Sequence, residues 1–268
     1  MGGTAGSEGI NAEQFESVER FAEDYLRTFF MGEPTPDDQA LIRFLIREYQ
    51  VIGGKYPLLE IGCGPVVNHV LPAVPYVTEI HMADLREDNL EQVRKWVQRD
   101  PAAHDWYRFT HFTLIEEGHE PTAQALADRE EQLRRLIKSV SRCDLRKKYP
   151  MGEPRTYPAV ACFYTTEQAS ANLAEWREVY RNLCSLVAPG GYFFNCAVGN
   201  TDHCILYDRE GRPWRYQLPV LETHHFVTAL EENGFDKNHS KVVYQPFAGQ
   251  ESEGVFAVIL VSAQKMPA

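Results

Sequence analysis

The stretch Tyr56-Pro57-Leu58-Leu59-Glu60-Ile61-Gly62-Cys63-Gly64-Pro65 decides the fold of this chain. A short apolar run reaches an acid and then breaks into two glycines one residue apart. This pattern predicts a buried strand that runs into a tight loop, where the backbone comes close to a ligand. A second strand-like run, 77–83, ends at Asp84, where a carboxylate can take ribose hydroxyls from a neighbouring strand tip. Together the two segments indicate a nucleoside-containing cofactor lying across the carboxyl ends of parallel strands.

The loop departs from the dinucleotide fingerprint, which needs a third glycine three residues after the second. Val67 occupies that position, and Pro65 and Val66 precede it. The missing glycine disfavours a nicotinamide-dependent oxidoreductase. An acid directly before the loop instead suits a cofactor with a positive sulfonium, such as S-adenosylmethionine. A plain turn after a strand would explain the two glycines alone, but not their spacing to Asp84.

Composition is that of a globular enzyme. The chain has 268 residues with 44% hydrophobic content, enough for one large core or a core with a cap. Its net charge of −11 makes a nucleic-acid phosphate backbone an unfavourable partner. The six cysteines form no C-x-x-C pair, which predicts buried thiols in a reducing cytoplasm. The histidines show no zinc-ligand spacing, so we expect no metal.

Neither end of the chain reads as a targeting or membrane segment. Residues 1–11 are small and polar, without the basic start and apolar centre of a signal peptide. The late apolar run 255–261 is far too short to span a membrane. We therefore expect no membrane partner and a cytoplasmic location. The oligomeric state is left open.

Helical and strand-like patterns alternate along most of the chain, which favours a parallel sheet covered on both faces. Near the end the pattern changes to a hairpin over 204–218 and two runs, 241–244 and 254–261, joined by a loop too short for a crossover helix. These two runs should pair antiparallel. The expected helices are 12–30, one starting at Pro36-Asp37-Asp38, 87–98, one opened by Pro101, 123–140, 173–187 and 222–233. Pro189-Gly190-Gly191 should close the helix 173–187. Further strands are expected at 159–164 and 192–198.

The chain resembles the family of nicotinamide, phenylethanolamine and thioether/indolethylamine N-methyltransferases over nearly its whole length. The block from Trp96 to Trp106 and the N-terminal Tyr25 are more diagnostic than the glycine loop, which all class I methyltransferases share. The matching stretches are Phe21-Ala22-Glu23-Asp24-Tyr25-Leu26-Arg27, the loop 59–65, Ala83-Asp84 with Asn89, Lys95-Trp96 through Asp105-Trp106, Leu114-Ile115-Glu116, Cys143-Asp144-Leu145, Leu186-Val187-Ala188-Pro189-Gly190-Gly191 and Glu253-Gly254-Val255-Phe256.

The resemblance implies an α/β fold, the Rossmann-like sheet of class I methyltransferases. The sheet should be mostly parallel with an antiparallel C-terminal strand pair. It implies a single domain over 1–268, with a helical N-terminal cap at 1–50, a core at 51–268 and the β-hairpin 204–218 over the active site. The cap helix should act as a lid.

The resemblance also assigns residues to the cofactor S-adenosylmethionine. Tyr25 should bond the cofactor carboxylate, and the two loop glycines should admit its methionine part. Asp84 and Asn89 should lie at the ribose, and Asp144 with Leu145 should flank the adenine. The predicted cofactor-binding residues are thus Tyr25, Gly62, Gly64, Asp84, Asn89, Asp144, Leu145 and Phe163.

On the substrate side, the resemblance makes Glu167 and Glu251 the candidate catalytic residues, because each matches an acid of the family's substrate pocket. Two carboxylates at strand ends could hold a protonated amine and accept its proton. Asn68, Asn200 and His203 replace residues usual in the family, so its nicotinamide-type pocket is not reproduced. The candidate substrate-binding residues are Phe30, Tyr164, Ala197, Asn200, His203 and Trp214.

The predicted function is methylation of a small aromatic or heteroaromatic amine, driven mainly by holding the acceptor and the methyl carbon in line in a dry pocket. Two alternatives stay open at this point. The acceptor atom could be a carbon of an electron-rich ring such as an indole, or the chain could be a regulator that binds the cofactor without catalysis.

Overall fold

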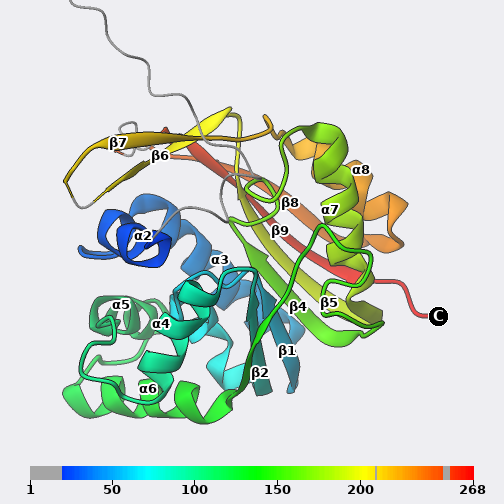
Figure 1. Cartoon of the computed structure of the whole chain (residues 1–268). Helices are drawn as coiled ribbons and strands as arrows, with labels where there is room; N and C mark the ends of the chain where they lie inside the picture. The colour runs from blue at the N-terminus through cyan, green and yellow to red at the C-terminus, as the bar shows by residue number, and fades with distance from the viewer. Residues whose placement is uncertain (1–19, 209, 250–253) are drawn as a thin grey trace, which may run out of the picture.

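Seven strands form the central sheet in the order β3-β2-β1-β4-β5-β9-β8 (Figure 1). The computed structural model describes residues 20–208, 210–249 and 254–268. Within these, β9 runs antiparallel to both of its neighbours, and the other six strands share one direction. The strands are β1 (Tyr56–Ile61), β2 (Val77–Asp84), β3 (Ile137–Arg142), β4 (Tyr157–Phe163), β5 (Val187–Val198), β8 (Phe235–Pro246) and β9 (Ala257–Lys265). This confirms the predicted α/β fold with its antiparallel C-terminal pair.

Helices cover both faces of the sheet, as Figure 1 shows with α7 and α8 on one side and α3 to α6 on the other. Successive strand residues alternate between the two cores: Leu58 packs on the α3 side and Leu59 on the α7 side. The helices are α2 (Phe21–Phe29), α3 (Pro36–Ile52), α4 (Glu87–Val97), α5 (Tyr107–Glu116), α6 (Ala123–Leu136), α7 (Leu173–Ser185) and α8 (Thr223–Glu232), with a 3₁₀ segment η1 (Asn68–Tyr76).

The start of α3 follows the predicted signal. Pro36 occupies the first helical turn, and Thr35 and Asp38 form a capping box in which each side chain bonds the other's backbone. The first helix, predicted over 12–30, is described only as α2, and residues before 20 lie outside the described part. The stretch after Pro101 is a turn, with α5 starting at Tyr107 instead.

The prediction of one helix over 123–140 was wrong at its end. Helix α6 stops at Leu136, and Ile137–Arg142 forms β3, which pairs parallel with β2. Ile137 and Val140 are spaced for a helix face as well as for an irregular strand, so local pattern did not separate the two. Pairing with the edge of the sheet decides the outcome.

The Pro189-Gly190-Gly191 stretch is also not the helix terminator that was predicted. It lies within β5, which begins at Val187 and pairs there with Tyr157 before a register shift. Irregular pairing of this kind is where proline and glycine are tolerated inside a sheet. Helix α7 ends earlier, at Ser185.

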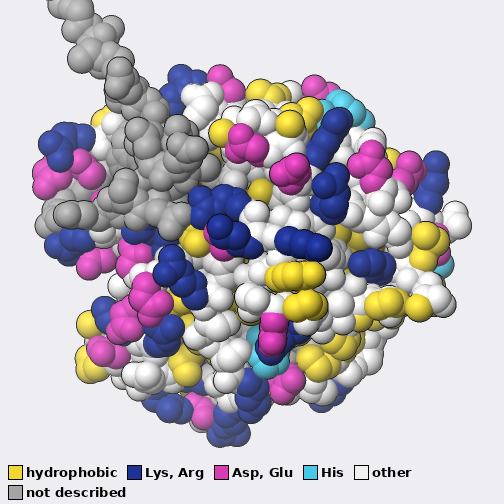
Figure 2. All heavy atoms as spheres, turned by 45° about the vertical axis from the view of Figure 1, so that its right-hand side comes forward, with side chains coloured by type: hydrophobic (Ala, Val, Ile, Leu, Met, Phe, Trp, Pro, Cys, Tyr) yellow, Lys and Arg dark blue, Asp and Glu magenta, His cyan; other side chains and the backbone are white. Residues whose placement is uncertain are grey.

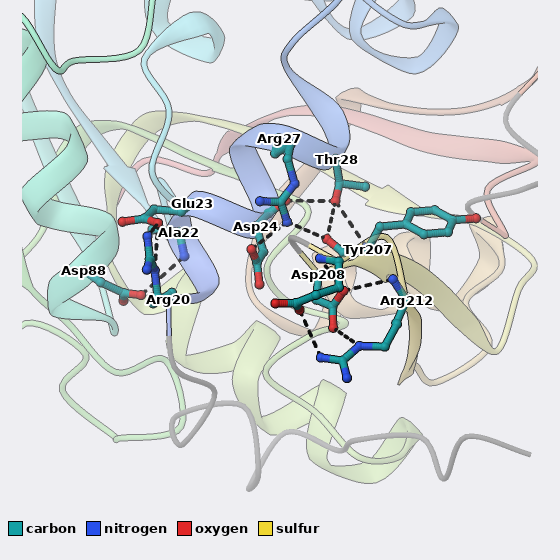
Figure 3. A network of polar contacts seen from close by, with 11 residues as sticks. Arg20, Ala22, Glu23, Asp24, Arg27, Thr28, Asp88, Tyr207, Asp208 and Arg212 are labelled. Carbon is teal, nitrogen blue, oxygen red and sulfur yellow. Dashed lines mark hydrogen bonds and ion pairs between the residues drawn. The ribbon is translucent and has the colours of Figure 1, made fainter. Parts of the chain in front are cut away.

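The predicted hairpin is present as β6 (His203–Tyr207) and β7 (Pro213–Gln217), which pair antiparallel near α2 (Figure 1). Figure 3 shows how helix and hairpin are joined. The Arg27 guanidinium donates to the Tyr207 carbonyl at 3.1 Å, and the Thr28 hydroxyl donates to the same oxygen at 3.2 Å. The Tyr207 amide donates back to the Thr28 hydroxyl at 3.2 Å. The cap helix and the hairpin therefore form one connected cover at this end of the sheet.

The surface in Figure 2 carries basic side chains interspersed with acidic ones. On this face the pattern differs from the continuous basic stripe that a nucleic-acid backbone requires. In the described part of the chain, the helices lack the combined length and apolar character needed to cross a membrane.

Candidate active site

A cavity lies at the carboxyl ends of β1 to β4, where the strand order reverses. Ligands of open α/β sheets bind at this kind of switch point. All eight residues predicted to bind the cofactor line this cavity: Tyr25 from α2, Gly62 and Gly64 after β1, Asp84 at the end of β2, Asn89 from α4, Asp144 and Leu145 after β3, and Phe163 at the end of β4.

The two loop glycines are required for different reasons. Both have left-handed backbones, with φ of 73° at Gly62 and 60° at Gly64. A Cβ on Gly62 would lie 2.6 Å from Cβ of Thr165, so the loop packs against that side chain. A Cβ on Gly64 would meet nothing within 4 Å and would occupy open space at the cavity wall. Gly64 therefore leaves room for a ligand to approach the backbone.

Asp84 organises the loop around it. Its carboxylate accepts from the Gly64 amide at 2.8 Å, the Arg86 amide at 2.8 Å and the Asn89 side chain at 2.9 Å. Burial raises the pKa of Asp84, and these three hydrogen bonds oppose the rise. A carboxylate has about four acceptor sites, so one remains for a ligand hydroxyl.

Asn89 supplies the test of whether a ribose fits here. Its Nδ2 is used by Asp84, but its Oδ1 is buried and has no hydrogen-bond partner within the described chain. Buried polar atoms of this kind are costly unless a ligand satisfies them. A diol that donates to Asn89 and Asp84 would do so, so the residues present fit the ribose of S-adenosylmethionine.

Asp144 is placed to accept from a second donor at the far side of the cavity. Although burial opposes it, the hydrogen bonds from Arg146 lower the pKa of Asp144, which keeps the carboxylate ionised. The Arg146 guanidinium donates to it at 2.9 Å. An acceptor held in this way suits the amino group of an adenine.

Replacing Asp84 by alanine is expected to weaken binding of S-adenosylhomocysteine by about 1.5–3 kcal/mol or more, because a charge-assisted acceptor is lost and the loop around Gly64 loses its anchor. Calorimetric titration measures the change. The exposed Asp128→Ala variant on α6 is the control and should bind as the unaltered protein does. Equal affinity of the two variants would contradict the role of Asp84.

A second cavity adjoins the first. Tyr25, Tyr164 and Gln168 line both cavities and so form the wall between them. The hairpin supports this wall, because the Tyr216 hydroxyl donates to the Gln168 carbonyl at 2.7 Å. Cys204 and Leu206 of the hairpin also line the second cavity, which places the hairpin over the site as predicted.

Two adjacent carboxylates face this second cavity, Asp37 and Asp38 at the start of α3. Asp38 is 4% exposed, and its Oδ2 accepts from the Thr35 amide at 3.1 Å and the Thr35 hydroxyl at 2.7 Å. Burial and the charge of Asp37 raise the pKa of Asp38. Within the described residues no cationic side chain pairs with Asp38, so a cationic ligand would relieve the cost of its burial.

Of the predicted substrate-binding residues, Phe30 and Tyr164 line the second cavity. Ala197 does not: it is fully buried on the α7 side of the sheet, and the next residue, Val198, lines the cavity instead. Side chains alternate along a strand, so an offset of one residue turns the contact to the opposite face.

Asn200 and His203 are also not brought to either cavity. Asn200 is exposed, and its backbone amide donates to the Leu221 carbonyl at 2.9 Å. Nδ1 of His203 lies 2.6 Å from the Asp202 carboxylate and 3.0 Å from the Arg215 guanidinium. The side chain of Trp214, like Glu251, lies outside the described part of the chain.

Glu167 lines neither of these two cavities. It is fully buried behind Val198, whose amide donates to its Oε1 at 2.9 Å, and the Thr166 hydroxyl donates to its Oε2 at 3.3 Å. Burial raises the pKa of Glu167 to about 7. The geometry therefore supports a positioning role, holding the end of β5, better than direct contact with a substrate.

Asp37 and Asp38 are the site residues that the sequence prediction missed. Pro36-Asp37-Asp38 was interpreted as a helix start, which is correct, and acids in a first helical turn need no further explanation. Only the fold shows that this helix start faces Tyr25 and Tyr164 across a cavity.

A family model described as the NNMT/PNMT/TEMT family matches residues 10–266. The chain belongs to this family. Nicotinamide N-methyltransferase of Sus scrofa is 27% identical over 88% of this chain and 90% of its own length. Indolethylamine N-methyltransferase of Mus musculus is 30% identical over 84% of this chain and 85% of its own length. Phenylethanolamine N-methyltransferase of Homo sapiens is 30% identical, over 50% of this chain and 48% of its own length.

Solved structures agree on the fold of this NNMT/PNMT/TEMT family member. The complex of DhpI with S-adenosylmethionine and HEP matches with a TM-score of 0.58 at 14% identity, covering 96% of this chain and 98% of that chain. Magnesium protoporphyrin IX methyltransferase from Synechocystis PCC 6803 matches with a TM-score of 0.57 at 10% identity, covering 95% and 97%. The family makes this chain an S-adenosylmethionine-dependent small-molecule methyltransferase, which confirms the predicted cofactor and enzyme class.

Proposed function

We propose that this methyltransferase acts on a small aromatic compound that carries a protonated amine, bound in the second cavity. The observation that carries the proposal is the pair of adjoining cavities with a common wall of Tyr25, Tyr164 and Gln168. One cavity fits the cofactor. The other has aromatic walls and two carboxylates at one side, which is the chemistry that recognises an aromatic amine.

The aromatic side chains suit a flat acceptor ring. Tyr25, Phe29 and Phe30 pack on one another, with ring centroids 5.0 Å apart for Tyr25 and Phe29 and 5.6 Å apart for Tyr25 and Phe30. All three line the second cavity together with Tyr164. Burial and the nearby Asp38 raise the pKa of Tyr25, so its hydroxyl stays protonated and available as a donor.

Asp38 is the group best placed to hold the amine and take its proton. Its Oδ2 is occupied by Thr35, which leaves Oδ1 for the ligand. An ammonium nitrogen has no lone pair, so one N–H proton must pass to an acceptor such as Asp38 Oδ1 before the nitrogen can attack. The raised pKa of Asp38 makes it a stronger proton acceptor than an exposed carboxylate would be.

When bound, the cofactor supplies a methyl group on a positively charged sulfur, open to in-line displacement. The chain's own contribution is to align the acceptor and exclude water, through the cover formed by α2 and the hairpin (Figure 3). The names of the nicotinamide, indolethylamine and phenylethanolamine relatives support nitrogen as the acceptor atom.

The acidic net charge of −11 supports a small-molecule partner over nucleic acid. All six cysteines are free and buried, which supports a reducing compartment, so we place the enzyme in the cytoplasm.

The test compares cationic and neutral acceptors. Asp38→Asn should lower kcat/KM for a protonated arylalkylamine by about ten- to a hundredfold, because a buried charge partner is lost. The loss for a neutral pyridine or indole should stay within about threefold, and affinity for S-adenosylhomocysteine should not change. Product masses and methyl positions, determined in the same assay, separate nitrogen from ring-carbon methylation.

Glu33→Gln is the control, since Glu33 is an exposed carboxylate on the same connecting segment that pairs with Arg108 at the surface. It should leave both acceptor classes unaffected. A uniform loss across cationic and neutral acceptors in Asp38→Asn would mean that Asp38 serves only to cap α3, and the amine-holding proposal would fail.

A further inference from the structure

A histidine and a carboxylate are paired beneath the glycine loop. Glu60 is the penultimate residue of β1, next to the loop, and is fully buried, and His69 lies in η1 and is 4% exposed. His69 Nδ1 is 3.4 Å from Glu60 Oε1, and His69 is the only ion-pair partner of Glu60 among the described residues. Burial raises the pKa of Glu60, and the contact with His69 opposes that rise.

The second ring nitrogen of His69 has no protein partner. Its Nε2 is buried without a hydrogen bond within the described chain, and the residue lines the cofactor cavity. A buried carboxylate is costly without a countercharge, and the raised pKa of Glu60 favours a proton held between Glu60 Oε1 and His69 Nδ1. With that proton in the Glu60 contact, the other ring proton lies on Nε2, which then needs an acceptor.

The position of His69 indicates which part of the cofactor lies near it. The acids that suit the nucleoside, Asp84 and Asp144, follow β2 and β3 at one side of the cavity. His69 lies at the other side, with its ring centroid 5.2 Å from that of Phe163 and 5.9 Å from that of Tyr164 at the end of β4. The amino-acid tail of the cofactor therefore falls on the His69 side.

We propose that His69 is a cofactor-binding residue of this chain, donating a hydrogen bond from Nε2 to the carboxylate of the cofactor's amino-acid tail while Glu60 orients the ring. Carboxylate–histidine pairs position one nitrogen through the other in the same way at metal sites. The inference rests on the family's cofactor and does not depend on which acceptor is methylated.

The test uses three ligands that differ only at the tail, measured by calorimetry without turnover. S-adenosylhomocysteine has the carboxylate, decarboxylated S-adenosylhomocysteine keeps the amine alone, and 5′-methylthioadenosine has no amino-acid tail; all three are neutral thioethers at sulfur. In His69→Leu, affinity for S-adenosylhomocysteine should fall about ten- to a hundredfold, the effect of losing a charge-assisted hydrogen bond. Affinities for the other two ligands should change by no more than about twofold.

His104→Leu is the matched control, because His104 also has a buried Nε2 without a partner but lies outside the cofactor cavity. It should bind all three ligands normally. His69→Asn, which keeps a polar group too short to bridge Glu60 and the cavity, should repeat the selective loss if the leucine variant is unstable.

An equal loss for the decarboxylated ligand would assign His69 to the amine and overturn the proposal. A loss for 5′-methylthioadenosine as well would show a general collapse of the cavity, with the same consequence. Since these are binding measurements, failure of the acceptor assay leaves their outcome unaffected.

Discussion

Replacing Gly62 by alanine is expected to destabilise the protein by about 2–5 kcal/mol and to remove measurable cofactor binding. The estimate combines two costs. Alanine would have to adopt the left-handed backbone at φ 73°, and its Cβ would lie 2.6 Å from Cβ of Thr165. Thr165 cannot move away freely, because its hydroxyl donates to the Gly62 and Phe163 carbonyls, each at 2.9 Å. Chemical unfolding and titration with S-adenosylhomocysteine measure both effects.

Gly64→Ala is the matched control for this prediction. Its backbone is equally left-handed, with φ 60°, but its Cβ would meet no protein atom within 4 Å. We expect a stability loss of only about 1–2 kcal/mol together with weaker cofactor binding, because the added methyl would occupy the cavity side of the loop. If the two variants unfold alike, packing against Thr165 is not what makes Gly62 necessary.

The cofactor half of the site could be predicted because its residues follow strand ends directly. Each parallel strand delivers its next few residues to the same edge, so Gly64, Asp84 and Asp144 meet without any knowledge of distant packing. Spacing along the chain predicted the two loop glycines and Asp84, whereas the resemblance supplied the other five predicted cofactor residues: Tyr25, Asn89, Asp144, Leu145 and Phe163. All eight line one cavity.

The acceptor half could not be predicted in the same way. Its cavity is assembled from α2, the start of α3, the end of β5 and the hairpin, which are far apart in sequence. A one-residue offset on β5 turned Ala197 to the wrong face and Val198 to the cavity. Glu167 was predicted as a catalytic carboxylate at a strand end, yet the fold buries it behind β5, where it accepts from the Val198 amide.

The misjudged β3 has the same origin. The run 137–142 contains too few apolar residues to define a period, and only its pairing with β2 makes it a strand. Edge strands of this kind take their conformation from the neighbouring strand rather than from their own propensity. Local pattern was reliable where a segment buries a full face, as in β1 and α3, and unreliable at the rim of the sheet.

Glu167 makes the stability of this protein depend on pH in a direction that can be worked out. Burial raises its pKa from the ordinary value of 4.5 to about 7 in the folded state. At a pH between these two pKa values, Glu167 keeps its proton in the folded protein and releases it in the unfolded chain. Stability contributed by protonated Glu167 is therefore present below about pH 4.5 and is lost as the pH rises through about 7. This shift of the pKa corresponds to a change of about 3 kcal/mol in the free energy of unfolding.

Glu167→Gln should abolish this pH dependence, because glutamine does not titrate. Its side-chain oxygen can still accept the hydrogen bond that the Val198 amide donates to Glu167 at 2.9 Å. Urea unfolding from pH 5 to pH 8 should show the variant gaining about 2.5 kcal/mol over the unaltered protein across the range. The exposed Glu178→Gln on α7 is the control and should run parallel to the unaltered protein. A constant difference between the Glu167→Gln and unaltered curves would mean that Glu167 ionises normally in the fold, and its position behind β5 would then have to be wet rather than buried.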